Sequence, residues 1–318
     1  MTLRLTLVTV AICLLTALAH PNSAPGASPI AKPTPVGLQY DEITRMAIPP
    51  ATPIPVGAFQ SDYAAIMNPS AQSASAAGYS DEMAAAMKAA GVKMPASMSN
   101  MMSGQLLRYA YFKGWVRVDD PVKQTAEIRK CDIHQFVELN LQKKTYSVSG
   151  QSMMQQETAA GAAASGPAMY GTIKMVVASK GTALGPQSID GVATNGYNLV
   201  NSMSITDVTG NCGQKGLMTT LMTEYVSGIH QPRAFCPMAL TGMPYGGSCK
   251  PTMTNHASGA VPASDRLVMY SKMASLPPGV TDPNAAVGAF VMERGNVKVL
   301  FLPDAQALFT VPKDFTKE

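Results

Sequence analysis

Alternation of apolar and polar residues dominates the chain beyond its N-terminal third. Between Tyr109 and Val118 the period is two, and this pattern predicts a strand over 106–119. Comparable stretches predict further strands at about 124–131, 134–140, 144–149, 169–180, 195–208 and 217–227. The glycine-rich segment Gly210–Gly216 predicts the hairpin tip between the last two. Apolar positions alternate there with Thr, Ser and Asn, which favours an antiparallel sheet with one wet face.

Helical patterns are few and short. Two Ala/Met-rich helices are predicted at about 60–67 and 81–90, and Met83 and Met87 share one face of the second. Ser264 and Asp265 predict the start of a third helix, over Arg266–Ser275.

The last strands are predicted as a hairpin. Its arms are Gly288–Met292 and Val297–Phe301, its turn is Glu293–Asn296, and Leu308–Phe315 follows as a short edge segment. Strands therefore predominate and no β-α-β alternation occurs. The sequence predicts an α+β fold, a strongly bent antiparallel sheet (half-barrel) with a few covering helices.

The N-terminus predicts export. Arg4, the apolar run from Leu5 to Ala19 and the small residues at its end are typical of a cleaved signal peptide over 1–19. Proline recurs through 20–58, which predicts an extended tether outside the sheet. The remainder, 59–318, is predicted to be a single α+β domain. It carries insertions at 149–166, which is low in complexity, and at 229–262, which is rich in Pro, Gly and Cys.

Cysteine usage agrees with a periplasmic or secreted location. Beyond the signal peptide the chain has Cys131, Cys212, Cys236 and Cys249, and four cysteines in an exported chain predict two disulfides. Zinc would need closer pairs, because the shortest spacing is between Cys236 and Cys249. The four cysteines can pair into two disulfides in three ways, and all three remain open. Loop length alone favours Cys236–Cys249, which leaves Cys131–Cys212.

Charge and motif content argue against several classes of function. Only 14% of residues are charged and the formal net charge is +4, without the basic clusters that phosphate contacts require, so no nucleic-acid partner is expected. His134, His230 and His256 are interpreted as strand or loop residues. Nucleophile-elbow, zinc-protease and phosphate-loop motifs are missing, so we expect a non-enzymatic protein without a cofactor.

The order of strand motifs resembles exported proteins of the LolA/LolB-like superfamily, in particular its uncharacterised branches. The matching segments are Tyr111–Asp119, Leu141–Tyr146, Ile189–Tyr197 and Leu308–Phe315. Each motif is mostly strand and turn chemistry, and the insertions depart from the lipoprotein carriers. The resemblance implies a bent sheet with a hydrophobic concavity and does not by itself carry over the lipoprotein-handling role.

Two binding functions follow from this concavity. In the first, it holds a lipid-like ligand or acyl chain, with a lining of Met83, Met87, Trp115, Met203 and Leu221. In the second, the sheet fills its own core, and loops such as 229–262 contact an envelope protein partner.

Methionine is the compositional anomaly, with 22 residues in the chain. Flexible Met lines adaptable apolar cavities, but it also replaces Leu in ordinary cores. A minor alternative is Cu(I) binding, because Met94, Met98 and Met101 would share one face of a helical turn.

Overall fold

The computed structural model describes residues 34–47, 55–68, 104–150, 170–212, 214–232, 248–277, 280 and 289–318. The predicted signal peptide, the helix at 81–90 and the insertion at 149–166, except its first two residues, lie outside these ranges. So do Met83, Met87, Met94, Met98, Met101 and Cys236.

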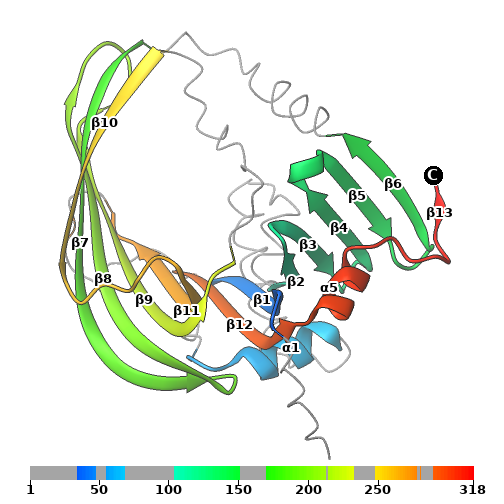
Figure 1. The fold of residues 1–318 in the computed structure, drawn as a ribbon. Coiled ribbons are helices and arrows are strands. Elements are labelled where there is room, and N and C mark those ends of the chain that lie inside the picture. Colours follow the sequence, from blue (N-terminus) through cyan, green and yellow to red (C-terminus); the bar gives the residue numbers. More distant parts are fainter. Residues whose placement is uncertain are drawn as a thin grey trace, which may run out of the picture. The chain divides into compact units, whose positions relative to one another are not determined.

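Strands make up most of the described residues (Figure 1). They are β1 (Gly37–Ala47), β2 (Gln105–Phe112), β3 (Trp115–Asp120), β4 (Thr125–Lys130), β5 (Gln135–Asn140), β6 (Thr145–Gly150), β7 (Tyr170–Ile189), β8 (Val192–Val208), β9 (Gly216–His230), β10 (Ser248–Gly259), β11 (Arg266–Ser275), β12 (Ala289–Leu300) and β13 (Thr316–Lys317). The described residues also contain the helices α1 (Phe59–Met67) and α5 (Leu302–Leu308), and a single 3-10 turn (Cys131–Ile133).

All of these strands belong to one sheet, in the order β10-β7-β8-β9-β11-β12-β1-β2-β3-β4-β5-β6-β13. Neighbouring strands are antiparallel except at the two edges, where β10 runs parallel to β7 and β13 runs parallel to β6. The sheet is bent and does not close into a barrel (Figure 1). The predicted α+β class with a bent sheet is therefore confirmed, and so is the first predicted helix, at α1.

The largest correction concerns the predicted tether. Residues Gly37–Ala47 do not lie outside the sheet but form β1, which pairs with β12 on one side and β2 on the other. The prolines that suggested a tether flank this run and do not enter it. Within it, Leu38, Tyr40 and Ile43 are buried, so the segment contributes to the core.

The predicted strand over 106–119 is in fact a hairpin. Lys113 and Gly114 both have positive φ, at 51° and 79°, which is the geometry of a type I′ turn. This turn separates β2 from β3, which pair in antiparallel register. Alternation resumes directly after the two-residue turn, with odd and even positions exchanging faces, so periodicity alone did not reveal the turn.

Three other predictions for the C-terminal part were wrong. Arg266–Ser275 is the strand β11 and not a helix, because its paired neighbours β9 and β12 outweigh a weak helical pattern. Residues 289–300 form one strand, β12, where a hairpin was predicted. Part of the predicted loop 229–262 is β10, and α5 was not predicted.

Both helices pack on the same face of the sheet, which we call the helix face. α1 places Phe59 against Ile43 and Leu106, and the chain around α5 places Phe309 against Phe112 and Trp115. Larger apolar clusters complete this core, including Ala126, Ile128, Val137 and Leu139. Residues at alternate positions point to the opposite side, which we call the trough face.

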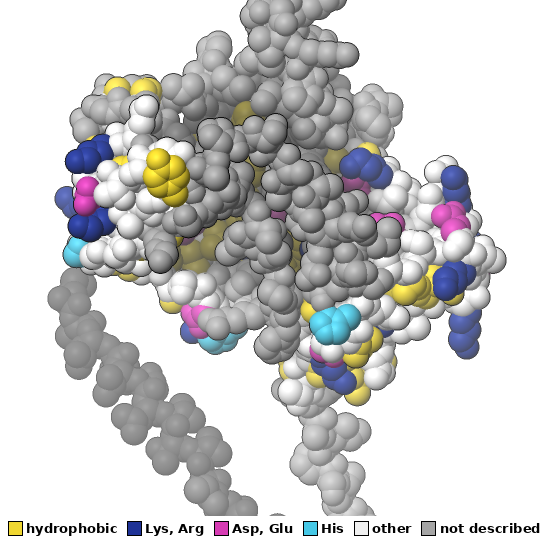
Figure 2. Space-filling view, turned by 90° about the horizontal axis from the view of Figure 1, so that it is seen from above, with side chains coloured by type: hydrophobic (Ala, Val, Ile, Leu, Met, Phe, Trp, Pro, Cys, Tyr) yellow, Lys and Arg dark blue, Asp and Glu magenta, His cyan; other side chains and the backbone are white. Residues whose placement is uncertain are grey.

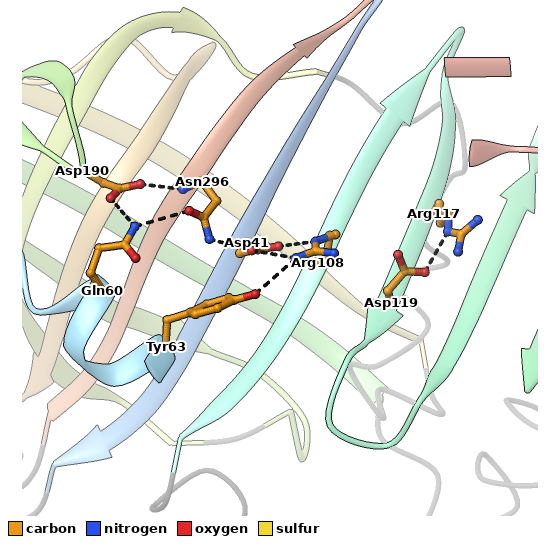
Figure 3. A network of polar contacts seen from close by, with 8 residues as sticks. All are labelled: Asp41, Gln60, Tyr63, Arg108, Arg117, Asp119, Asp190 and Asn296. Carbon is orange, nitrogen blue, oxygen red and sulfur yellow. Dashed lines mark hydrogen bonds and ion pairs between the residues drawn. The ribbon is translucent and has the colours of Figure 1, made fainter. Parts of the chain in front are cut away.

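A polar network ties α1 to the centre of the sheet on the helix face (Figure 3). Buried Asp41 accepts bonds from Arg108 Nε at 2.6 Å and from Asn296 Nδ2 at 2.9 Å. Gln60 of α1 donates to Asp190 at 2.6 Å, and Tyr63 of α1 lies 3.3 Å from Arg108. Because every member has a partner, the network fixes α1 without leaving an unpaired buried charge.

A second buried carboxylate lies beneath α1. Glu293 is 1% exposed, accepts a bond from the Gly57 backbone N–H at 3.2 Å and lies 3.4 Å from Arg45. Arg45 also pairs with Asp62 of α1. Burial raises the pKa of Glu293 to about 7, although Arg45 acts in the opposite direction.

Candidate functional site

A trough of about 810 Å³ lies on the trough face across β2–β6. Its floor combines apolar and tyrosine side chains, namely Leu107, Tyr109, Tyr111, Val116 and Val118. Volumes of this order are typical of small-ligand sites, which are mostly apolar with a few placed polar groups. Strand alternation produces the trough, because the same strands send their other side chains into the core under α5.

Three tyrosines form a stacked group at the β1–β2 side of the trough. The ring centroids of Tyr40 and Tyr109 are 5.5 Å apart, those of Tyr40 and Tyr111 are 5.9 Å apart, and the hydroxyls of Tyr40 and Tyr111 are 3.2 Å apart. Burial raises the pKa of both Tyr109 and Tyr111 well above the usual range. Both phenols therefore stay protonated and can donate hydrogen bonds.

Arg294 holds this tyrosine group in place. Its guanidinium lies 4.8 Å from the centroid of the Tyr40 ring and pairs with Glu42 at 2.8 Å. It also donates to the Val268 carbonyl at 3.0 Å and to Gln231 at 3.2 Å. Because these partners use its charge, Arg294 orders the tyrosines and is not an open anion site.

Charged groups line the β4–β5 side of the trough. Glu127 and Glu138 are direct cross-strand partners, and Arg129 pairs with Glu127. Ser147 Oγ donates a long hydrogen bond of 3.4 Å to Glu138 Oε2. The trough therefore has an aromatic, apolar floor and a polar, partly acidic side, which suits an amphipathic molecule.

The trough face continues as a methionine-rich surface across β7–β12 and β1. The register places Met203 opposite Met218, Met222 opposite Met273, and Met46 opposite Phe290. Each described strand methionine whose ladder partners fix its side lies on the trough face: Met46, Met175, Met203, Met218, Met222, Met253, Met273 and Met292. Met269 lies at an irregularity of β11 and packs in the core.

The five residues predicted to line the ligand site do not come together. Trp115 lies on the helix face, where its ring contacts Phe112 and Phe309 and its Nε1 donates to Asp132 at 2.6 Å. Met203 lies on the trough face, as required for the site. Leu221 pairs with Val200 and points to the opposite side from Met203. Met83 and Met87 lie outside the described residues, as do the metal candidates Met94, Met98 and Met101.

The trough residues were missed although their signal was present. Tyr109, Tyr111, Val116 and Val118 all stand in the segment whose alternation was noted. Reading that segment as one strand put Tyr111 and Trp115 on the same face. The two-residue turn at Lys113 brings β3 back alongside β2, so that Tyr111 pairs with Val116 and Phe112 pairs with Trp115.

Cys212 and Cys249 form a disulfide, with Cα atoms 5.8 Å apart. This pairing corrects the preference for Cys236–Cys249. The β8–β9 loop lies beside the start of β7, and β10 runs parallel to β7 from the same end, which brings the two cysteines together. Cys131 is disulfide-bonded as well, and its partner lies outside the described residues. Disulfides agree with an oxidising location for the protein.

Figure 2 shows Lys and Arg side chains at opposite margins of the described part, with hydrophobic side chains beside them. Among the described residues, His, Cys, Asp and Glu form no group of three that could hold a metal ion. No helix in the described ranges is long and apolar enough to cross a membrane.

No protein-family model matches the chain, and no curated protein matches its sequence.

Proposed function

We propose that this is an exported, non-enzymatic protein that binds an amphipathic, lipid-like ligand on the trough face. The observation that carries the proposal is the trough of about 810 Å³, with its tyrosine and aliphatic floor and its polar side at Glu127, Arg129 and Glu138. An apolar ligand body would lie against the floor, and its head group would meet the charged side.

The predicted signal peptide and the Cys212–Cys249 disulfide support a periplasmic or secreted location. A place in the LolA/LolB-like superfamily fits the bent sheet and stays part of the proposal. The methionine-rich surface extends the apolar area beyond the trough, and flexible thioether side chains adapt to chains of different shape.

The direct test is native mass spectrometry of protein purified from its own host, which is expected to show a co-purifying lipid. A binding assay with a fluorescent fatty acid should then separate two variants. Val118→Glu introduces a charge into the floor of the trough and is expected to weaken binding at least about tenfold. Val122→Glu is the matched control, because Val122 is exposed in the turn after β3 and does not line the trough.

A protein-interaction role is the second candidate, favoured by the edge of the sheet. Among the described strands, β10 pairs only with β7, and its side chains from Pro251 to Gly259 are exposed. An open edge of this length can accept a strand from an envelope partner. Capture of a partner that is lost when Thr254 is replaced by Pro, with no lipid in the mass spectrum, would favour this role over ligand binding.

A further inference from the structure

Four methionines from neighbouring strands form a continuous row on the trough face. Met253 of β10 pairs with Met175 of β7, and Met203 of β8 pairs with Met218 of β9. Met203 pairs with Val177, two residues from Met175, so Met175 and Met203 are diagonal neighbours on one face. We call Met253, Met175, Met203 and Met218 the methionine row.

Sheet geometry places the sulfurs of neighbouring members of this row within reach of a common ion. Directly paired residues have Cβ atoms about 4.5–5.5 Å apart, and diagonal neighbours about 7–8 Å. Methionine has three rotatable side-chain bonds, so its thioether can cover such a distance without backbone movement. The row can therefore bring several sulfurs together at one point above β7 and β8.

Packing does not account for sulfur at these positions. Met253 is 56% exposed and Met218 is 48% exposed, while Met175 and Met203 are only partly buried. The buried clusters of the helix face use Ile, Leu, Val and Phe instead. Leu would give these positions a similar apolar area, and ordering a Leu side chain costs less conformational entropy than ordering Met.

We propose that the methionine row binds a soft monovalent metal ion, Cu(I). Thioethers are soft, neutral ligands that favour Cu(I), and several of them bind it without histidine or thiolate. The nearby Cys212 and Cys249 are joined in a disulfide, so they offer no competing thiolate. The methionine row shares no residue with Met94, Met98 and Met101, and the proposal does not depend on the proposed lipid function.

The test is an anaerobic Cu(I) competition titration of the full chain, purified with its disulfides intact, and repeated with redox-inert Ag(I). The row variant Met175→Leu/Met203→Leu/Met218→Leu/Met253→Leu keeps the apolar area and removes the sulfur. Its affinity is expected to fall at least about tenfold, with the thermal midpoint close to wild type.

Two control variants make the result specific. Met222→Leu/Met273→Leu removes a paired set of thioethers from the same face but outside the row, and one of them already accepts a bond from Asn201 at 2.8 Å. Met94→Leu/Met98→Leu/Met101→Leu removes the other candidate cluster. Both controls are expected to keep the affinity of wild type.

Methyl-labelled methionine NMR with Ag(I) provides a readout that does not depend on any substitution. The methyl signals of the row are expected to shift, and those of Met222 and Met273 to stay unchanged. Unchanged affinity in the row variant would overturn the proposal, and so would shifts confined to methionines outside the row. A row variant that fails to fold leaves the decision to the NMR measurement.

Discussion

The ring of Phe59 in α1 lies directly over Gly295 of β12. A Cβ atom at position 295 would be 2.3 Å from Phe59 Cδ1 and 2.7 Å from Asp190 Oδ2. Phe59 is 1% exposed and holds α1 on the sheet together with Ile43 and Leu106. Glycine is therefore required at this crossing, since any side chain would displace the helix.

This contact makes Gly295→Ala a strongly destabilising change. We expect a loss of about 1–3 kcal/mol, as for overpacked cores, with faster hydrogen exchange in α1. Gly216→Ala is the matched control, because a Cβ there would meet nothing within 4 Å. Chemical denaturation of both variants checks the prediction, and equal stabilities would contradict it.

The second prediction concerns pH. Burial raises the pKa of Glu293 from 4.5 to about 7, and the charged or titratable groups around it are Arg45 of β1, Asp62 of α1 and Tyr270 of β11. A carboxyl whose folded pKa is raised stabilises the protein fully below its unfolded pKa, and this contribution is lost as pH rises through the folded pKa. Wild type should therefore lose stability relative to Glu293→Gln between about pH 4.5 and 7.

Thermal unfolding of wild type and Glu293→Gln across this range provides the measurement. Only the difference between the two curves is diagnostic, because Asp62 and the other carboxyls titrate in both proteins. We expect that difference to change by on the order of 3 kcal/mol and to level off above the folded pKa. Parallel curves would mean that Glu293 does not titrate in this window.

A third prediction addresses the disulfide. Cys212 and Cys249 are separated by 37 residues. Closing such a loop lowers the conformational entropy of the unfolded chain, which stabilises the folded protein by at most about 4 kcal/mol. Cys212→Ser/Cys249→Ser should lower the stability by a comparable or smaller amount. Because the bond anchors the start of β10, the backbone amides of β10 should lose more protection from hydrogen exchange than those of β4 and β5. Uniform loss of protection would argue against a local anchor.

The turn between β2 and β3 gives the fourth prediction. Gly114 has φ of 79°, so Gly114→Ala is expected to cost about 1 kcal/mol. Lys113→Asn should stabilise the protein slightly, because Asn tolerates the left-handed conformation that Lys113 adopts at 51°. Gly228→Ala is a suitable control, since Gly228 has open space around it. Urea midpoints test this prediction: Gly114→Ala should lower the midpoint, Lys113→Asn should raise it slightly, and Gly228→Ala should leave it close to wild type.

Much of the sheet could be predicted because its strands alternate regularly. The predicted ranges 124–131, 134–140 and 144–149 match β4, β5 and β6 within a residue or so. β8 and β9 were also placed correctly. Met203 and Leu221 were both predicted to line the ligand site, but the register pairs Met203 with Met218 and Leu221 with Val200, which places them on opposite faces.

The missed elements share a physical cause, since local chemistry suggested one structure and strand pairing imposed another. Glu293–Asn296 resembles a turn, and Asn296 does have a positive φ of 51°. The chain nevertheless continues as one strand with an irregular register, because β1 pairs with β12 on both sides of that point. The same holds for Gly37–Ala47, where flanking prolines suggested an extended tether and pairing with β2 and β12 made a strand.

The position of β1 has a consequence for how the protein is made. β2–β6 pair with near neighbours in the chain, so this half can form while synthesis continues. β1 joins the two halves of the sheet, but its pairing with β12 spans from Gly37 to Leu300. The β12 side of β1 therefore stays unpaired until nearly the last residues of the chain are available. Until then this edge is a row of unpaired backbone groups, which can pair with a strand of another chain.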